Sequence, residues 1–185
     1  MSNTPNSNKI RAGNFFEDFK LNQVITHATP RTIGEGEVAL YMALTGARQA
    51  LHSADTLAQS LGYKARPVDD LLAFHIAFGK TVPDISVNAV TNLGYAEVRF
   101  LQPVYAGDTL STSSTVIGLK QNSNGQSGVV YVRSVSTNQL QQPVFSWVRW
   151  VMVHKKDHNA PAPATVIPSL ADAVASADLA VPAFL

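Results

Sequence analysis

Apolar residues recur with helical spacing over residues 38–45, so one face of this segment is predicted to be buried. The Thr32-x-x-Glu35 pattern before the segment has the form of a capping box, in which the two side chains satisfy backbone N–H groups of the first turn. Gly46 follows as a plausible helix stop. The pattern therefore predicts a helix that is capped at Thr32 and stops at Gly46.

A longer apolar helix is predicted after Pro67, because Leu71, His75 and Phe78 share one face at helical spacing. Gly79 and Pro83 are expected to end it, since both residues disfavour a helix interior.

Shorter elements surround these two helices. The β-branched residues 24–26 (VIT) predict a short strand. Ser53 is expected to cap a short helix over residues 54–61, and the aromatic segment 14–19 (NFFEDF) is expected to dock on the core.

The pattern changes to strands in the second half of the chain. Strands are predicted over residues 94–105, 110–119, 129–137 and 144–153, and the segment 122–125 (NSNG) is a hairpin signal. Successive strands joined by tight turns predict an antiparallel meander. The order of strand, helices and antiparallel sheet indicates the α+β class, and a sheet curled around one apolar helix is the hotdog architecture.

Three segments of different composition are expected. Residues 1–12 are predicted to be a flexible arm and residues 13–157 the folded domain. Residues 158–185 are rich in Ala and Pro and show no lasting periodic face, so they are predicted to be a linker or tail.

Composition narrows the classes of function. Charged residues make up 15% of the 185 residues, below the roughly 25% of an average globular protein, which suggests that a partner covers part of the surface. The 14 basic and 13 acidic residues nearly balance, so neither a nucleic acid nor an anionic membrane is the expected partner. The chain has no cysteine, which excludes disulfides and thiol chemistry. No apolar run resembles a membrane span or a signal peptide, and a cytoplasmic location is expected.

Several segments together resemble the MaoC-like hotdog dehydratases. The strand and turn at residues 99–110 (RFLQPVYAGDTL) and the loop from Gly62 through Pro67 are similar to that family's signatures. The further matching segments are 13–19 (GNFFEDF), 27–32 (HATPRT), 74–85 (FHIAFGKTVPDI) and 149–153 (RWVMV).

The resemblance implies a hydro-lyase that acts on an enoyl-CoA thioester, with reversible hydration of mesaconyl-CoA to β-methylmalyl-CoA as the specific expectation. It implies no cofactor beyond the CoA of the substrate. Family members of this kind are about twice as long and contain two hotdog halves. The chain is therefore expected to be one half, with a second hotdog half or a second copy as its partner.

The family's catalytic segment has a Gly-Asp-x-Asn-Pro-x-His pattern, and the matching segment here begins at Gly46 and ends at His52 (GARQALH). His52 keeps the family's histidine, which would exchange a proton with the α-carbon of the substrate. The Asp position is Ala47, which cannot take a proton, and the Asn position is Gln49.

Asp70 is the candidate that would replace the missing carboxyl group, and with His52 it forms the predicted catalytic pair. The alternative is that Asp69 and Asp70 only favour the positive end of the third helix. Leu71 takes the position of the glycine that usually precedes the family's oxyanion helix, which limits a close backbone approach.

The remaining candidates concern substrate binding. His75 is expected to be a buried, hydrogen-bonded core histidine, or else to line the acyl tunnel or contact the second half. The predicted substrate-binding residues are Arg48, Gln49, Leu71, His75, Lys80 and Arg99, and Lys120 and Arg133 are further candidates for the CoA phosphates. No metal site is predicted.

Two other functions stay open. A non-catalytic half that orients a catalytic partner is consistent with Ala47 and Leu71. An acyl-CoA thioesterase would need a carboxylate near the thioester carbonyl, for which Asp69 or Asp70 could serve.

Overall fold

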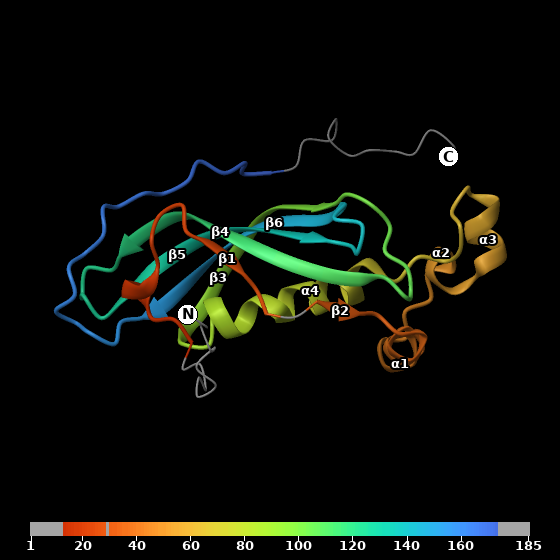
Figure 1. Cartoon of the computed structure of the whole chain (residues 1–185), viewed down its shortest axis with the longest axis horizontal. Coiled ribbons are helices and arrows are strands. Elements are labelled where there is room, and N and C mark those ends of the chain that lie inside the picture. The colour runs from red at the N-terminus through yellow and green to blue at the C-terminus, as the bar shows by residue number, and fades with distance from the viewer. Residues whose placement is uncertain (1–12, 29, 174–185) are drawn as a thin grey trace, which may run out of the picture.

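The computed structural model describes residues 13–28 and 30–173, so the predicted arm over residues 1–12 and the end of the predicted linker lie outside the described residues. A six-stranded antiparallel sheet carries one long helix, α4, along one face (Figure 1). In chain order the elements are η1 (Phe16–Asp18), β1 (Val24–Thr26), β2 (Arg31–Thr32), α1 (Glu35–Thr45), α2 (Ala50–Ser53), α3 (Asp55–Ser60), α4 (Asp70–Ile85), β3 (Ala89–Phe100), β4 (Thr109–Gln121), β5 (Ser127–Thr137) and β6 (Pro143–His154).

The strand order is β1-β4-β5-β6-β3, with β2 paired to β4, and all of these pairs are antiparallel. The predicted meander of four long strands is therefore confirmed, although β3 begins and ends about five residues earlier than expected. The Asn122–Gly125 hairpin is also confirmed, since the Gly125 N–H donates to the Asn122 carbonyl at 3.0 Å. The strand β3 is left at one edge of the sheet.

The inner face of the sheet packs on α4 through two apolar clusters. One cluster lies around Ile76 and Trp147, and the other around Ile85 and Val132. Phe16 and Phe19 are buried in the second cluster, so the aromatic segment near the N-terminus docks on the core as predicted.

The helix α4 does not end at Gly79 or Pro83, and that prediction is wrong. It continues to Ile85, because Asp84 and Ile85 are both buried between the helix and the sheet. Pro83 lies in the last turn, where the loss of one backbone hydrogen bond costs little compared with the packing of these two side chains.

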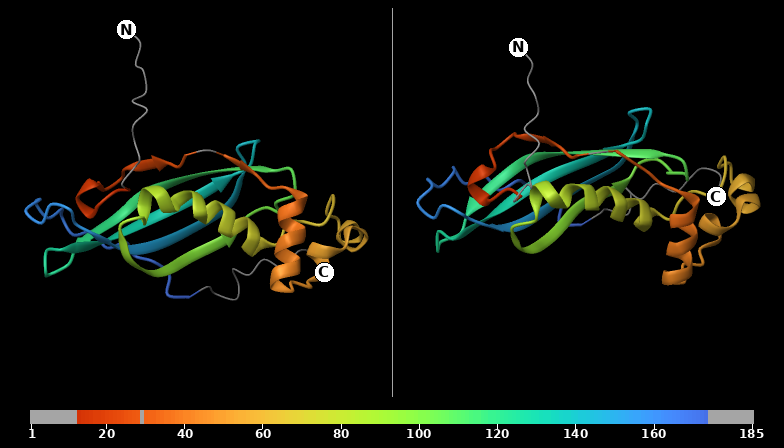
Figure 2. Two further views of the ribbon diagram at one scale, coloured as in Figure 1. Left: turned by 90° about the horizontal axis from the view of Figure 1, so that it is seen from below. Right: turned by 60° about the horizontal axis from the view of Figure 1, so that its bottom comes forward.

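The shorter helices also differ from the expectation. The prediction of a capping box at Thr32 is wrong, because Thr32 lies in the strand β2. The helix α1 begins after Gly34, whose N–H donates to the Glu37 carboxylate at 2.9 Å. Ser53 ends α2, where its hydroxyl donates to the Gln49 carbonyl at 3.0 Å, instead of capping the next helix. In Figure 2 the helices α1, α2 and α3 extend beyond one end of the sheet.

The segment that follows β6 runs extended along the sheet, on the side opposite to α4 (Figure 1). Val166 pairs with Leu119 of β4 through two backbone hydrogen bonds of 2.9 Å. Gly118 lies directly under this contact, since a Cβ there would be 2.6 Å from the Val166 carbonyl oxygen. The part of the predicted linker within the described residues is thus held on the sheet.

Candidate functional site

The segment that carries the predicted histidine crosses from α1 to α2, at the end of the molecule beyond the sheet. His52 lies in the last turn of α2 and is buried. Its Nδ1 is 3.0 Å from the Pro67 carbonyl oxygen. A carbonyl oxygen only accepts, so Nδ1 carries the proton in this contact, and the neutral ring keeps a lone pair on Nε2.

The two aspartates at the start of α4 have different environments. Asp69 is the N-cap, and its Oδ1 accepts from the Leu71 N–H at 2.9 Å and more weakly from the Leu72 N–H at 3.4 Å. The prediction that Asp69 supports the helix start is therefore confirmed.

Asp70 is the first residue of α4, where a carboxylate also suits the positive end of the helix, and its carboxyl group is partly buried. Burial raises the pKa of the Asp70 carboxyl above its usual value, the charge of Asp69 adds to the rise, and His52 opposes it. The fold thus brings His52 and Asp70 within electrostatic reach of each other, although 17 residues separate them in the sequence.

The other predicted binding residues do not gather around this pair. Arg48 and Gln49 are exposed on the connection between α1 and α2, and Arg99 is exposed on β3. Of the further basic candidates, Lys120 is exposed on β4 and Arg133 forms an ion pair with Glu97 at 2.7 Å.

The prediction that His75 is a buried core histidine is wrong. The side chain is exposed on α4, because it falls on the stripe that also presents Leu71 and Gly79 to solvent. The alternative, that it lines a substrate channel or contacts a second half, stays a prediction.

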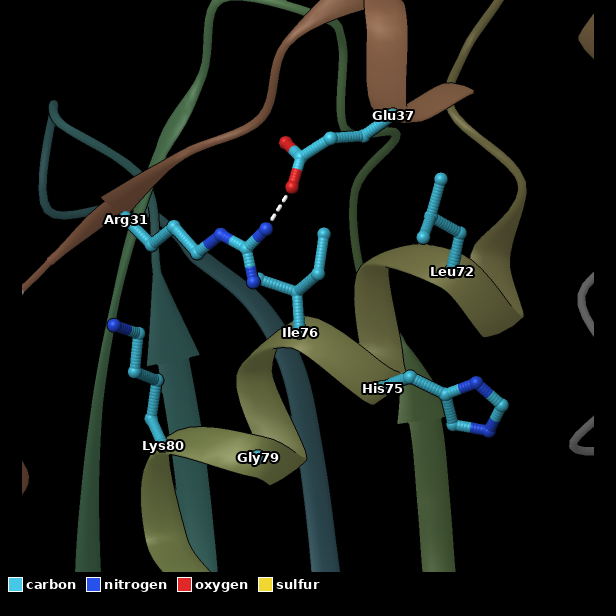
Figure 3. Close-up of a pocket in the computed structure, with 7 residues that line it drawn as sticks. All are labelled: Arg31, Glu37, Leu72, His75, Ile76, Gly79 and Lys80. Atoms are coloured by element: carbon cyan, nitrogen blue, oxygen red, sulfur yellow. Dashed lines mark hydrogen bonds and ion pairs between the residues drawn. The ribbon is translucent and has the colours of Figure 1, made fainter. Parts of the chain in front are cut away.

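A pocket of about 450 Å³, here called the α4 pocket, lies between α4 and the chain that leads from β2 into α1 (Figure 3). Its lining residues are Arg31, Glu37, Leu72, His75, Ile76, Gly79 and Lys80. Two of the predicted binding residues, His75 and Lys80, therefore line the same pocket, although their side chains point in different directions in Figure 3. The pocket begins two residues after Asp70 on the same helix.

Sequence reasoning missed the other side of this pocket. Arg31 forms an ion pair with Glu37, and the second oxygen of Glu37 accepts from the Gly34 N–H. Arg31 belongs to the 27–32 segment that carried part of the family resemblance, and that segment was the available signal.

A second polar cluster is buried between α4 and the sheet. The His27 ring bridges Asp84 and Ser114, with Nδ1 to Oδ2 at 2.9 Å and Nε2 to Oγ at 2.7 Å. Ser114 also contacts Ser134 at 2.7 Å. The order of groups matches a Ser-His-Asp triad, but Ser114 is 1% exposed and cannot meet a thioester. The cluster therefore gives the thioesterase hypothesis no nucleophile.

Arg149 lies on the inner face of the sheet and is almost fully buried. It donates to the Thr81 hydroxyl at 3.0 Å and covers the Phe78 ring at 4.5 Å. Burial lowers the pKa of Arg149 to about 10, which leaves the guanidinium charged at neutral pH. The arginine thus holds the C-terminal half of α4 against β6.

Neither a metal site nor a membrane span is found in the part of the chain that the structure describes. No group of three His, Asp or Glu side chains there could hold a metal ion. No helix among the described residues is long and apolar enough to cross a membrane.

Two curated proteins are similar to almost the whole chain. The β-methylmalyl-CoA dehydratase of Chloroflexus aurantiacus is 62% identical over 176 residues, which are 95% of this chain and 50% of that protein. The mesaconyl-CoA hydratase of Cereibacter sphaeroides is 60% identical over 174 residues, which are 94% of this chain and 51% of that protein. The chain spans about half the length of these curated relatives.

Solved structures confirm the predicted fold. A MaoC domain protein dehydratase from Chloroflexus aurantiacus superposes with a TM-score of 0.89 at 63% identity, over 92% of this chain and 48% of that one. Rv0216 of Mycobacterium tuberculosis, which has a double hotdog fold, superposes with a TM-score of 0.71 at 25% identity, over 93% of this chain and 52% of that one. The chain has the α+β hotdog fold. The model of the MaoC-like domain matches residues 18–139, and the chain therefore belongs to the MaoC-like domain family.

Proposed function

We propose that this chain is one hotdog half of a hydro-lyase that reversibly hydrates mesaconyl-CoA to β-methylmalyl-CoA. The observation that carries the proposal is the identity of 62% and 60% to two proteins named for this substrate and product, over nearly all of this chain. We assign residues 13–157 to the hotdog domain and residues 158–185 to a linker or tail. A cytoplasmic location fits this assignment.

Hydration adds water across the carbon–carbon double bond of the thioester. The oxygen bonds to the β-carbon, one proton of the water goes to a base, and an acid gives a proton to the α-carbon. The sum is one water consumed, and no oxidant or reductant is needed.

His52 and Asp70 are the groups of this half that suit these two transfers. The lone pair on Nε2 of His52 would accept the proton from water, because the Pro67 carbonyl holds the ring in that tautomer. Asp70, whose pKa is raised by burial, would give a proton to the α-carbon. In hydration His52 thus takes a proton from water, whereas the sequence led us to expect that it exchanges a proton with the α-carbon. In dehydration His52 is the acid and Asp70 is the base.

The partner in this proposal is a second hotdog half, or a second copy of the chain. The edge strand β3 carries exposed apolar side chains along its length, among them Leu93, Tyr95 and Phe100. An exposed apolar edge strand of this length is a surface that another strand can pair with.

A second candidate is a half that binds substrate and orients a catalytic partner without performing the chemistry. Ala47 favours it, because the family's carboxylate is absent from the segment before His52. Leu71 favours it too, because an exposed leucine takes the place of the expected glycine at the start of α4.

The test is hydration of mesaconyl-CoA by the purified chain, followed by the loss of enoyl-thioester absorbance. We expect turnover that falls at least 100-fold in His52→Ala and in Asp70→Asn, because each removes one proton transfer. Asp172→Asn is the matched control, since this carboxylate is exposed in the segment after β6 and its loss should leave turnover unchanged. A folded but inert chain would support the non-catalytic half instead.

A further inference from the structure

The α4 pocket combines a cationic side and an apolar side. In Figure 3 the guanidinium of Arg31 lies above Ile76, with Lys80 on one side and Glu37 on the other. Leu72 and Ile76 supply apolar side chains, and Gly79 leaves the helix backbone bare. The lining residues thus suit a ligand with an anionic end and a small branched body.

Glu37 offsets only part of the positive charge of this pocket, because it is one carboxylate beside both Arg31 and Lys80. One of its oxygens accepts from Nη2 of Arg31 and the other from the Gly34 N–H. A guanidinium has five N–H donors, and among the described residues the Arg31 side chain makes no hydrogen bond other than the one to Glu37. Arg31 can therefore still receive an anion, and Lys80 adds a second positive charge.

Room for the ligand comes from Gly79. A Cβ placed on this residue would meet no heavy atom within 4 Å, although the residue lies inside a helix. The space above Gly79 is open and is bordered by Lys80 and Ile76.

We propose that the α4 pocket binds the free carboxylate of a branched dicarboxylic acyl thioester, with Arg31 and Lys80 as the residues that recognise it. The inference rests on the proposed function and deepens it by assigning the specificity for a charged acyl group. The methyl branch of the acyl group would lie on Leu72 and Ile76. A guanidinium suits a carboxylate because two of its parallel N–H groups can reach both oxygens.

The phosphates of CoA are also anions that Arg31 and Lys80 can bind. The binding experiment therefore distinguishes these phosphates from the free carboxylate of the acyl group. Dissociation constants are measured by calorimetry for mesaconyl-CoA, for CoA, and for tiglyl-CoA, which has a methyl group in place of the carboxylate. We expect mesaconyl-CoA to bind about tenfold more tightly than tiglyl-CoA, as for a hydrogen bond to a charged group. Lys80→Met should abolish most of this preference, and Lys80→Arg should keep it.

A steric variant tests the place of binding. Gly79→Leu puts a side chain into the α4 pocket at a helix position that tolerates leucine, and it should weaken binding of mesaconyl-CoA about tenfold or more. Gly36→Leu is the matched control, because Gly36 also has no close neighbour in its helix but does not line the pocket, and this variant should bind as the wild-type chain does. Circular dichroism confirms that each variant is folded.

Three results would overturn the inference. Equal binding of mesaconyl-CoA and tiglyl-CoA would show that the α4 pocket does not recognise the carboxylate. The proposed function as an acyl-CoA-binding half would not be affected by this result. Equal weakening of CoA and mesaconyl-CoA by Lys80→Met would assign the pocket to the phosphates. Failure of the folded chain to bind any of the three would reject both the inference and the proposed substrate binding by this half.

Discussion

At the scale of single residues, close contacts decide which side chains this fold accepts. Gly128 on β5 lies against the ring of Phe16, and a Cβ there would overlap with two carbons of the ring. Phe16 is 1% exposed and fills one end of the core, so it has no space into which to move.

Gly128→Ala should therefore lower the free energy of unfolding by about 1–3 kcal/mol, the usual cost of overpacking a core. Gly79→Ala serves as the control, because its added methyl group meets nothing and replaces a glycine inside a helix. Urea unfolding of both variants gives the measurement. A Gly128→Ala variant as stable as the wild type would mean that Phe16 is not fixed in the core.

His27 makes the stability of the fold depend on pH. Burial lowers the pKa of His27 below its usual 6.5, and Arg149 adds to this, while the hydrogen bond and the charge of Asp84 act in the opposite direction. The unfolded chain therefore binds a proton at a pH where the folded chain does not.

The free energy of unfolding is expected to fall as the pH decreases from about 6.5 towards the lower pKa of the folded state. Well above pH 6.5 the ring is neutral in both states, so its titration adds no slope there. His27→Gln keeps polar atoms in the site but does not titrate, and should make this part of the profile flatter. Denaturant unfolding at several pH values tests this, and an unchanged slope in His27→Gln would contradict it.

At the scale of elements, the extended segment after β6 depends on one glycine of the sheet. Gly118 allows the Val166 backbone to approach β4, and the pairing of Val166 with Leu119 satisfies both backbone groups of each residue. An Ala/Pro-rich sequence has little tendency to form its own structure, so the sheet supplies the order.

Gly118→Ala is expected to displace this segment, because the new Cβ would lie 2.6 Å from the Val166 oxygen and 2.7 Å from a Pro168 ring carbon. Hydrogen exchange at the Leu119 and Val166 amides should accelerate, while amides in the middle of β5 keep their protection. Gly36→Ala, at a helix position with no close neighbour, is the control. Unchanged protection of Val166 would show that the contact does not hold the segment.

At the scale of the whole molecule, no strand within residues 13–28 and 30–173 pairs with the outer edge of β3. The strand β3 pairs with β6 on one side only, and its exposed apolar residues include Leu93 and Tyr95, each more than 40% exposed. Two such edges can pair and remove this surface from water.

The purified chain is therefore expected to self-associate in the absence of a second half. Leu93→Lys places a charge on the edge and should shift the chain to monomers at a concentration at which the wild type is dimeric. Sedimentation velocity measures both states. A wild-type chain that sediments as a single monomeric species would contradict the expectation. The control is Lys120→Ala, which lies on β4 away from this edge.

Local pattern determined much of the fold. The strands β4 to β6 were predicted closely, because their signals depend on neighbours in sequence. These signals are the loose alternation over residues 129–137, the Asn122–Gly125 turn and the Gln/Pro turn before residues 144–153. The end of α4 was not, because burial of Asp84 and Ile85 against the sheet outweighs the local effect of Pro83.

For the candidate site, too, the sequence indicated some of the residues and the tertiary structure decided how they are arranged. The sequence alone indicated His52 and Asp70, through a family motif and a helix start, and it indicated Lys80 as a basic residue on α4. Only the tertiary structure decided which groups meet, because Arg31 reaches the α4 pocket from a strand 49 positions before Lys80. It also decided that His75 is exposed, since spacing identifies a face of a helix but not whether a neighbouring element covers that face.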